Sequence, residues 1–109
     1  MKNATEQEIK KSIADYLRLN KFIVINHRNV GIYKQDTKKY IPLPSGEKGV
    51  SDLIACSPKG IFVAIEVKKK GGRPTPEQIE FLSRVNDSGG IGILAYSLDE
   101  VIGEIGESS

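Results

Sequence analysis

Three charged residues stand within or next to two apolar segments that are typical of buried strands. Asp52 lies in the segment from Val50 to Cys56, and Glu66 and Lys68 lie at the end of the segment that starts at Ile61. Burying a charge is costly unless a partner or a metal ion compensates for the lost hydration. These positions therefore indicate a functional site.

The sequence between the two segments predicts that the carboxylates meet. Pro58-Lys59-Gly60 suits a three-residue hairpin loop, because proline presets φ and glycine accepts the left-handed conformation that closes the loop. In that register Asp52 lies opposite Glu66 with the Cβ atoms ~5 Å apart, and Lys68 shares their face. A loop shorter or longer by one residue would send the carboxylates to opposite faces. The predicted site thus depends on the turn at Gly60.

Two carboxylates at that distance repel each other, so the pair is stable only with a proton or a cation between them. Oxygen ligands without imidazole or thiolate favour a hard divalent ion, Mg²⁺ or Mn²⁺. A neighbouring lysine can orient water for attack on a phosphate or stabilise the negative charge that develops there. Asp52, Glu66 and Lys68 together therefore predict phosphodiester hydrolysis.

Composition is compatible with this chemistry. With 109 residues, of which 39% are hydrophobic and 28% charged, we expect residues 1–109 to form a single globular domain with one modest core. The net charge of +2 hides an asymmetry, because residues 1–73 hold 15 Lys and Arg against 7 Asp and Glu, whereas residues 74–109 hold 1 against 7. The predicted site lies in the basic part, which favours a polyanionic partner such as DNA.

The cysteine usage and hydropathy predict a cytoplasmic protein. Cys56 has no second cysteine to pair with, which fits a reducing intracellular compartment, and we expect it to be a small core residue. No apolar run approaches the ~18 residues of a membrane span, and the N-terminus lacks the apolar core of a signal peptide. Neither a membrane nor an organic cofactor is expected as a partner.

Periodicity and capping residues predict the order αβ(β)ββαβα, a mixed α/β sheet flanked by helices. Capping boxes at Thr5-x-x-Glu8 and at Thr75-x-x-Gln78 mark two helix starts, and Gly89-Gly90 ends the second helix. The last crossover should be parallel and right-handed. The expected segments are helices over 5–20, 75–87 and from about 98, strands over 22–26, 50–56, 61–67 and 91–96, and a ribbon within 30–43, with 42–49 as loop.

The same residues resemble a known nuclease signature. Asp52, a spacer of 13 residues and Glu66-Val67-Lys68 are similar to the PD-(D/E)XK motif, in which the first residue is often not proline. Five ordered segments resemble the VRR-NUC branch of that superfamily: Glu6-x-x-Ile9, Tyr16-Leu17-Arg18-Leu19, Lys48-Gly49-Val50-Ser51-Asp52-Leu53-Ile54, Ile65-Glu66-Val67-Lys68, and Thr75-Pro76-Glu77-Gln78 with Phe81-Leu82. The resemblance covers nearly the whole chain.

The resemblance implies a restriction-endonuclease-like fold and a hydrolase, an endodeoxyribonuclease that depends on Mg²⁺ or Mn²⁺. It implies metal contacts by Asp52, Glu66 and the Val67 carbonyl, with Lys68 assisting the attacking water. Stand-alone members act on branched DNA as dimers, which implies a homodimer that resolves four-way (Holliday) junctions. Two symmetric cuts fit a twofold dimer.

A further carboxylate is expected from the first helix, which offers Glu6 and Glu8. At 100° per residue Glu6 falls within the arc of the apolar stripe, whereas Glu8 points toward solvent and suits the capping box. Glu6 is therefore the favoured catalytic residue, with the role of holding the water; its alternative role is to complement the helix dipole.

The candidates for nucleic-acid binding are more loosely defined. Gln78 completes a capping box, yet a glutamine after the E-x-K strand borders the site in related nucleases, so the two roles stay open. The remaining candidates, each of which is also compatible with a solvated surface position, are Arg28, Lys48, Lys69, Lys70 and Arg73.

Three alternatives to a junction nuclease remain open. The same site would serve a nuclease for flaps, single strands or DNA ends. A non-catalytic DNA-binding module has no need of a carboxylate pair that demands a metal. If Asp52, Glu66 and Lys68 instead form a structural ion pair, replacing Asp52 with alanine should destabilise the fold.

Overall fold

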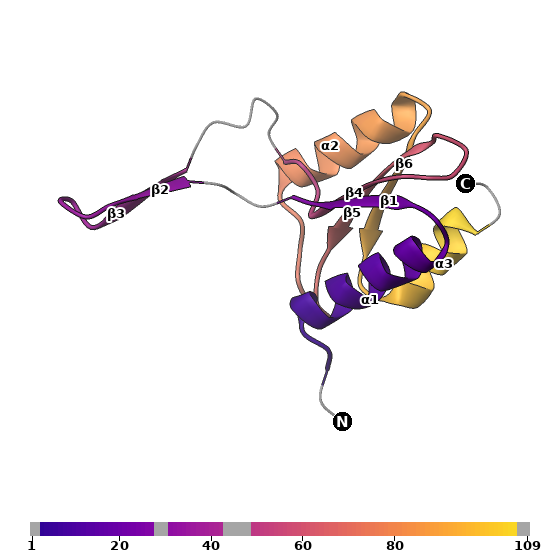
Figure 1. Ribbon diagram of the computed structural model, residues 1–109, viewed down its shortest axis with the longest axis horizontal. Coiled ribbons are helices and arrows are strands. Elements are labelled where there is room, and N and C mark those ends of the chain that lie inside the picture. The colour runs from indigo at the N-terminus through magenta and orange to yellow at the C-terminus, as the bar shows by residue number, and fades with distance from the viewer. Residues whose placement is uncertain (1–2, 28–30, 43–48, 107–109) are drawn as a thin grey trace.

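The computed structural model describes residues 3–27, 31–42 and 49–106 of this chain. Along the described chain lie three α-helices and six strands, in an order that matches the expected one (Figure 1). The elements are α1 (Glu6–Leu19), β1 (Ile23–Asn26), β2 (Gly31–Lys34), β3 (Lys39–Pro42), β4 (Leu53–Cys56), β5 (Phe62–Val67), α2 (Pro76–Asp87), β6 (Ile91–Ala95) and α3 (Leu98–Ile105).

The central sheet has the strand order β1-β4-β5-β6 and is mixed. Strands β1, β4 and β5 are antiparallel neighbours, whereas β6 pairs with β5 in parallel after the crossover through α2. This arrangement confirms the predicted mixed α/β fold. It also places the ends of β1, β4 and β5 that carry polar residues at one edge of the domain.

The tight turn between β4 and β5 sets the register as predicted. Gly60 has φ +84°, and its N–H donates to the Ser57 carbonyl at 2.8 Å, while the Ser57 N–H donates to the Ile61 carbonyl at 2.9 Å. The pairs Leu53 with Ile65 and Cys56 with Phe62 follow from that closure. The three-residue loop is therefore confirmed.

The helices cover the two faces of the sheet unequally. Helices α1 and α3 lie on one face and enclose the main core, while α2 lies on the other face over β5 and β6 (Figure 1). Strand β5 is buried along nearly all of its length, whereas Ile23 and Ile25 of the outer strand β1 are 68% and 60% exposed. Cys56, expected in the core, is only half-buried. Helix α2 is too far along the sheet to cover β1.

Both predicted capping boxes are confirmed. Thr5 and Thr75 each accept a hydrogen bond from the N3 backbone, and the N3 side chains of Glu8 and Gln78 accept one from the cap backbone in return. Each cap fixes where its helix begins, and therefore which side chains of the first turn meet the sheet.

The ribbon expected within residues 30–43 is confirmed as a two-stranded hairpin of β2 and β3, separate from the central sheet. Figure 1 shows it projecting away from the rest of the domain. It follows His27 and precedes Gly49 in the chain, so it is inserted beside the polar edge of the sheet. None of the helices in the described ranges is long and apolar enough to cross a membrane.

Gly92 is a position where strand and helix backbones approach closely. A Cβ atom built there would lie 2.4 Å from the Leu82 carbonyl oxygen of α2. We expect Gly92→Ala to lower the free energy of unfolding by about 1–3 kcal/mol, because α2 must move off the sheet. Denaturant unfolding measures the change.

The matched control is Gly103→Ala in α3, where an added Cβ meets nothing within 4 Å. There alanine should stabilise the protein by about 0.5–1 kcal/mol through helix propensity. Equal destabilisation by both substitutions would contradict the close approach at Gly92.

Candidate active site

Asp52 directly precedes β4, at the edge of the sheet where β4 begins and β1 and β5 end. Its backbone carbonyl accepts a hydrogen bond from the His27 N–H at 2.8 Å, and its Oδ2 accepts one from the Val67 N–H at 3.0 Å. Continuing the observed β4–β5 register by one pair sets Asp52 opposite Glu66. The predicted meeting of the two carboxylates is confirmed.

Glu66 is buried, with 2% of its surface exposed. Its Oε2 accepts a hydrogen bond from Gln78 Nε2 at 3.2 Å, whereas its Oε1 has no hydrogen-bond partner among the described residues. Burial, followed by the charge of Asp52 and a hydrogen bond to it, raises the pKa of Glu66 to about 7, against the opposing effect of Lys68. The carboxylate is therefore held in a setting that demands a proton or a cation.

Lys68 lies on the same side of β5 as Glu66. Its Nζ is 3.7 Å from Glu66 Oε2, and its side chain is 18% exposed. Its backbone N–H donates to the Ala95 carbonyl of β6 at 3.0 Å, which fixes the residue just beyond the end of β5. A single weak ion pair leaves the ammonium group able to donate toward an incoming ligand.

Gln78 both completes the capping box and contacts the candidate site. Its Oε1 accepts from the Thr75 N–H at 2.8 Å, which completes the capping box, while its Nε2 donates to Glu66. The amide suits this position because it carries an acceptor and a donor at once. A glutamate would also close the capping box but would add a third carboxylate beside Glu66 and Asp52.

The first helix separates its two glutamates as expected. Glu8 Oε1 accepts from the Thr5 N–H at 2.9 Å, and these cap hydrogen bonds lower the pKa of Glu8. Glu6 instead turns to the loop after β5, where its Oε2 accepts from the Lys69 N–H at 3.3 Å. A Cβ atom placed on Gly72 would lie 3.7 Å from Glu6 Oε2 and 3.5 Å from Lys68 Cβ. Glu6 thus contacts the backbone of the residue that follows Lys68.

The ligand atoms at this edge fit a hard cation. Asp52 and Glu66 supply oxygen atoms only, and the buried Glu66 Oε1 accepts no hydrogen bond from the part of the chain that the structure describes. Within the described ranges, no three His, Cys, Asp or Glu side chains gather as a ready ligand set. Two carboxylates with room for water or phosphate oxygens are typical of magnesium sites, which keep several exchangeable ligands.

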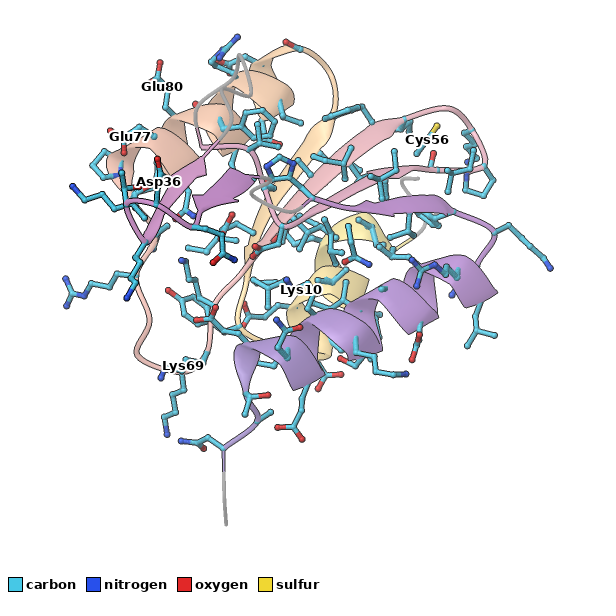
Figure 2. All side chains as sticks on the ribbon, turned by 60° about the vertical axis from the view of Figure 1, so that its left-hand side comes forward. Lys10, Asp36, Cys56, Lys69, Glu77 and Glu80 are labelled. Carbon is cyan, nitrogen blue, oxygen red and sulfur yellow. The ribbon has the colours of Figure 1, made fainter. Side chains whose placement is uncertain are left out.

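The structure places some basic candidates and leaves others out. Lys69, Lys70 and Arg73 are exposed in the loop that leads from β5 to α2, and Figure 2 labels Lys69 on that loop. Tyr96 contacts this loop through its hydroxyl, which donates to the Gly72 carbonyl at 2.9 Å. Arg28 and Lys48 lie outside the described residues.

A groove on the other flank of the site escaped the sequence analysis. It has a volume of about 760 Å³ and extends from α1 past the end of β1 to Asp52 and Gln78. Its α1 wall carries Lys10, Lys11 and Arg18. The separation of eight residues between Lys10 and Arg18, close to two helical turns, was the signal that could have revealed it.

Comparison with known proteins agrees with this geometry. The family model for the VRR-NUC domain matches residues 4–98. A solved structure described as a VRR_NUC domain superposes with a TM-score of 0.67 at 20% identity, covering 97% of this chain and all of the other. A second, described as a VRR_NUC domain protein, has a TM-score of 0.61 at 21% identity, covering 94% of this chain and 85% of its own.

Curated protein sequences gave no significant match. The family match spans the hairpin with Asp52 and Glu66, as well as α1 and α2, which supply Glu6 and Gln78. The chain therefore belongs to the VRR-NUC family of nuclease-type domains.

Proposed function

We propose that this protein is a divalent-metal-dependent endodeoxyribonuclease that hydrolyses phosphodiester bonds at the edge formed by Asp52, Glu66 and Lys68. One observation carries the proposal: the buried Glu66 carboxylate lies across from Asp52 with its Oε1 unpaired in the described structure. A fold has no structural use for such a pair, because it costs stability unless a cation binds.

Asp52, Glu66 and the Val67 carbonyl would hold Mg²⁺ or Mn²⁺. The metal, when bound, supplies a Lewis acid that offsets negative charge on a phosphoryl oxygen. Gln78 fixes the orientation of Glu66 through its amide, and the Val67 N–H fixes that of Asp52. Both carboxylates are thus held in place before substrate arrives.

Hydrolysis forms a bond between a water oxygen and phosphorus and breaks one phosphorus–oxygen ester bond. Lys68 donates toward the attacking water or the phosphoryl oxygens, where its ammonium group stabilises the negative charge of the transition state. Glu6, whose carboxylate contacts the backbone of the residue after Lys68, accepts a hydrogen bond from the water and so orients it.

The proposed substrate is a four-way junction, and the proposed active form is a homodimer. Resolution of a junction requires two symmetric cuts, and a twofold dimer of small domains presents two equivalent sites. The projecting β2–β3 hairpin extends the protein surface beside the site (Figure 1). This supports a substrate larger than a simple DNA end. Sedimentation in the presence of junction DNA should give a dimer; a monomer alone would contradict this part.

The test compares the protein and its Lys68→Ala variant on labelled four-way junction, flap, single-stranded and plain duplex DNA, in Mg²⁺, Mn²⁺ or EDTA. We expect paired nicks in the junction with metal, none in EDTA, and a loss of about 10²–10⁴-fold in rate for Lys68→Ala. Junction binding by the variant should persist, since the substitution leaves Asp52 and Glu66 in place.

The other outcomes separate the alternatives. Cleavage of flaps, single strands or ends in preference to junctions would retain the site but change the substrate. Binding without cleavage in Mn²⁺ would leave a non-catalytic DNA-binding module and overturn the proposed activity.

A further inference from the structure

The groove beside α1 continues directly from the candidate active site. One end is formed by Asp52 and Gln78, and its long wall is formed by Lys10, Lys11, Ala14 and Arg18 of α1. The loop with Lys69, Lys70 and Arg73 follows Lys68, and the Lys69 N–H donates to Glu6 of α1. Basic residues therefore lie both along the groove and in the loop after Lys68.

The spacing of the wall residues defines one stripe of the helix. Lys10, Ala14 and Arg18 are separated by four residues each, which sets them above one another on one face. Ala14 is buried and small, so the wall is recessed between the two long side chains. Lys10 and Arg18 are ~12 Å apart along the helix axis, which corresponds to roughly three to four base-pair steps of duplex.

The free positive charge of the groove comes from Lys10 and Arg18. Lys11 is already paired with Asp15 at 2.7 Å, whereas neither Lys10 nor Arg18 has an ion-pair partner among the described residues. Figure 2 labels Lys10 between α1 and the strands. Glu8 is the acidic residue of this wall, and its carboxylate is engaged in the helix cap.

We propose that this groove binds the sugar-phosphate backbone of the DNA next to the cleaved bond, with Lys10 and Arg18 as phosphate contacts. The inference rests on the proposed nuclease function and deepens it. The wall has no large apolar side chain that would anchor a peptide or a small organic ligand, and its cations are spaced along a line that ends at the reacting edge.

The test measures binding of labelled four-way junction and duplex DNA in EDTA, where no cleavage occurs, for Lys10→Glu, Arg18→Glu and a matched control. Lys59→Glu makes the same change of charge in the exposed turn between β4 and β5, at the other end of the sheet from Asp52. We expect each groove variant to bind about tenfold more weakly at 0.1 M salt, with a slope of log K against log salt reduced by roughly one. Lys59→Glu should bind like the unmodified protein.

Thermal unfolding of all four proteins shows whether the variants are folded. Groove variants that are folded and bind DNA like the Lys59→Glu protein would overturn the inference, even if the unmodified protein cuts DNA as proposed. A protein that binds DNA through Lys10 and Arg18 but never cleaves would support the groove and overturn the nuclease. Failure of the unmodified protein to bind any DNA would overturn both.

Discussion

Asp52→Asn is expected to reduce DNA cleavage by about a thousandfold or more while stabilising the metal-free fold. The amide retains an oxygen that can accept from the Val67 N–H, so the local hydrogen bond survives. What is lost is the negative charge that would hold the cation, whose contribution of several kcal/mol to the transition state corresponds to at least ~10³ in rate. Cleavage assays in Mg²⁺ and thermal unfolding in EDTA measure the two effects.

The opposite signs of the two effects distinguish a catalytic pair from a structural one. In EDTA the substitution removes the repulsion between Asp52 and Glu66, so the melting temperature should rise. Asp99→Asn, at an exposed position in the first turn of α3, is the matched control and should alter neither activity nor stability appreciably. A fall in stability large enough to explain the lost activity would favour the structural ion pair.

The elements that local sequence determines were predicted well. The turn at Pro58-Lys59-Gly60 fixes the β4–β5 register without help from the rest of the fold, so the meeting of Asp52 and Glu66 followed from a single glycine. The capping boxes at Thr5 and Thr75 likewise involve only residues three apart. Glu6 could be told from Glu8 because residues two positions apart in an α-helix, with about 3.6 residues per turn, point to different faces.

Some contacts between distant elements could not be predicted. The half-covered sheet arises because α2 follows β5 and lies over β6, which leaves Ile23 and Ile25 of β1 exposed; no local pattern encodes how far α2 reaches. The family resemblance placed Gln78 near the site, but its hydrogen bond to Glu66 could not be foreseen because it depends on how α2 lies against β5. The basic residues of α1 form the wall of a groove only because the end of β1 and Asp52 lie beside them, which the sequence does not show.

The stability of the metal-free protein should fall as the pH rises from about 4.5 to about 7. The raised pKa of Glu66 means that the folded state binds a proton more tightly than the unfolded chain, whose glutamate titrates near its ordinary value of 4.5. Between these values the unfolded chain holds fewer protons, so the free energy of unfolding decreases with pH. The full separation between the two pKa values corresponds to a decrease of about 3 kcal/mol in the free energy of unfolding, which is complete above pH 7.

Glu66→Gln isolates this contribution, because the amide has nearly the same shape and cannot ionise. In EDTA the variant should become more stable relative to the unmodified protein as the pH rises. This difference in unfolding free energy should level off above pH 7. Other carboxylates, such as Glu8 with its lowered pKa, titrate in both proteins and cancel in the difference. Chemical denaturation at a series of pH values gives the curve.

Metal should reverse the effect in the unmodified protein alone. At pH 8, Mg²⁺ or Mn²⁺ that binds the folded state raises its stability in proportion to the logarithm of the metal concentration over the dissociation constant. Glu66→Gln removes one of the two carboxylates and should lose most of this response. If the stability difference between the two proteins does not change from pH 4.5 to 8, Glu66 is not the carboxyl with the raised pKa. If both proteins respond equally to metal, Glu66 is not a ligand. If Mn²⁺ abolishes the dependence of this stability difference on pH, the instability of the buried pair is connected to the cation that the proposed reaction requires.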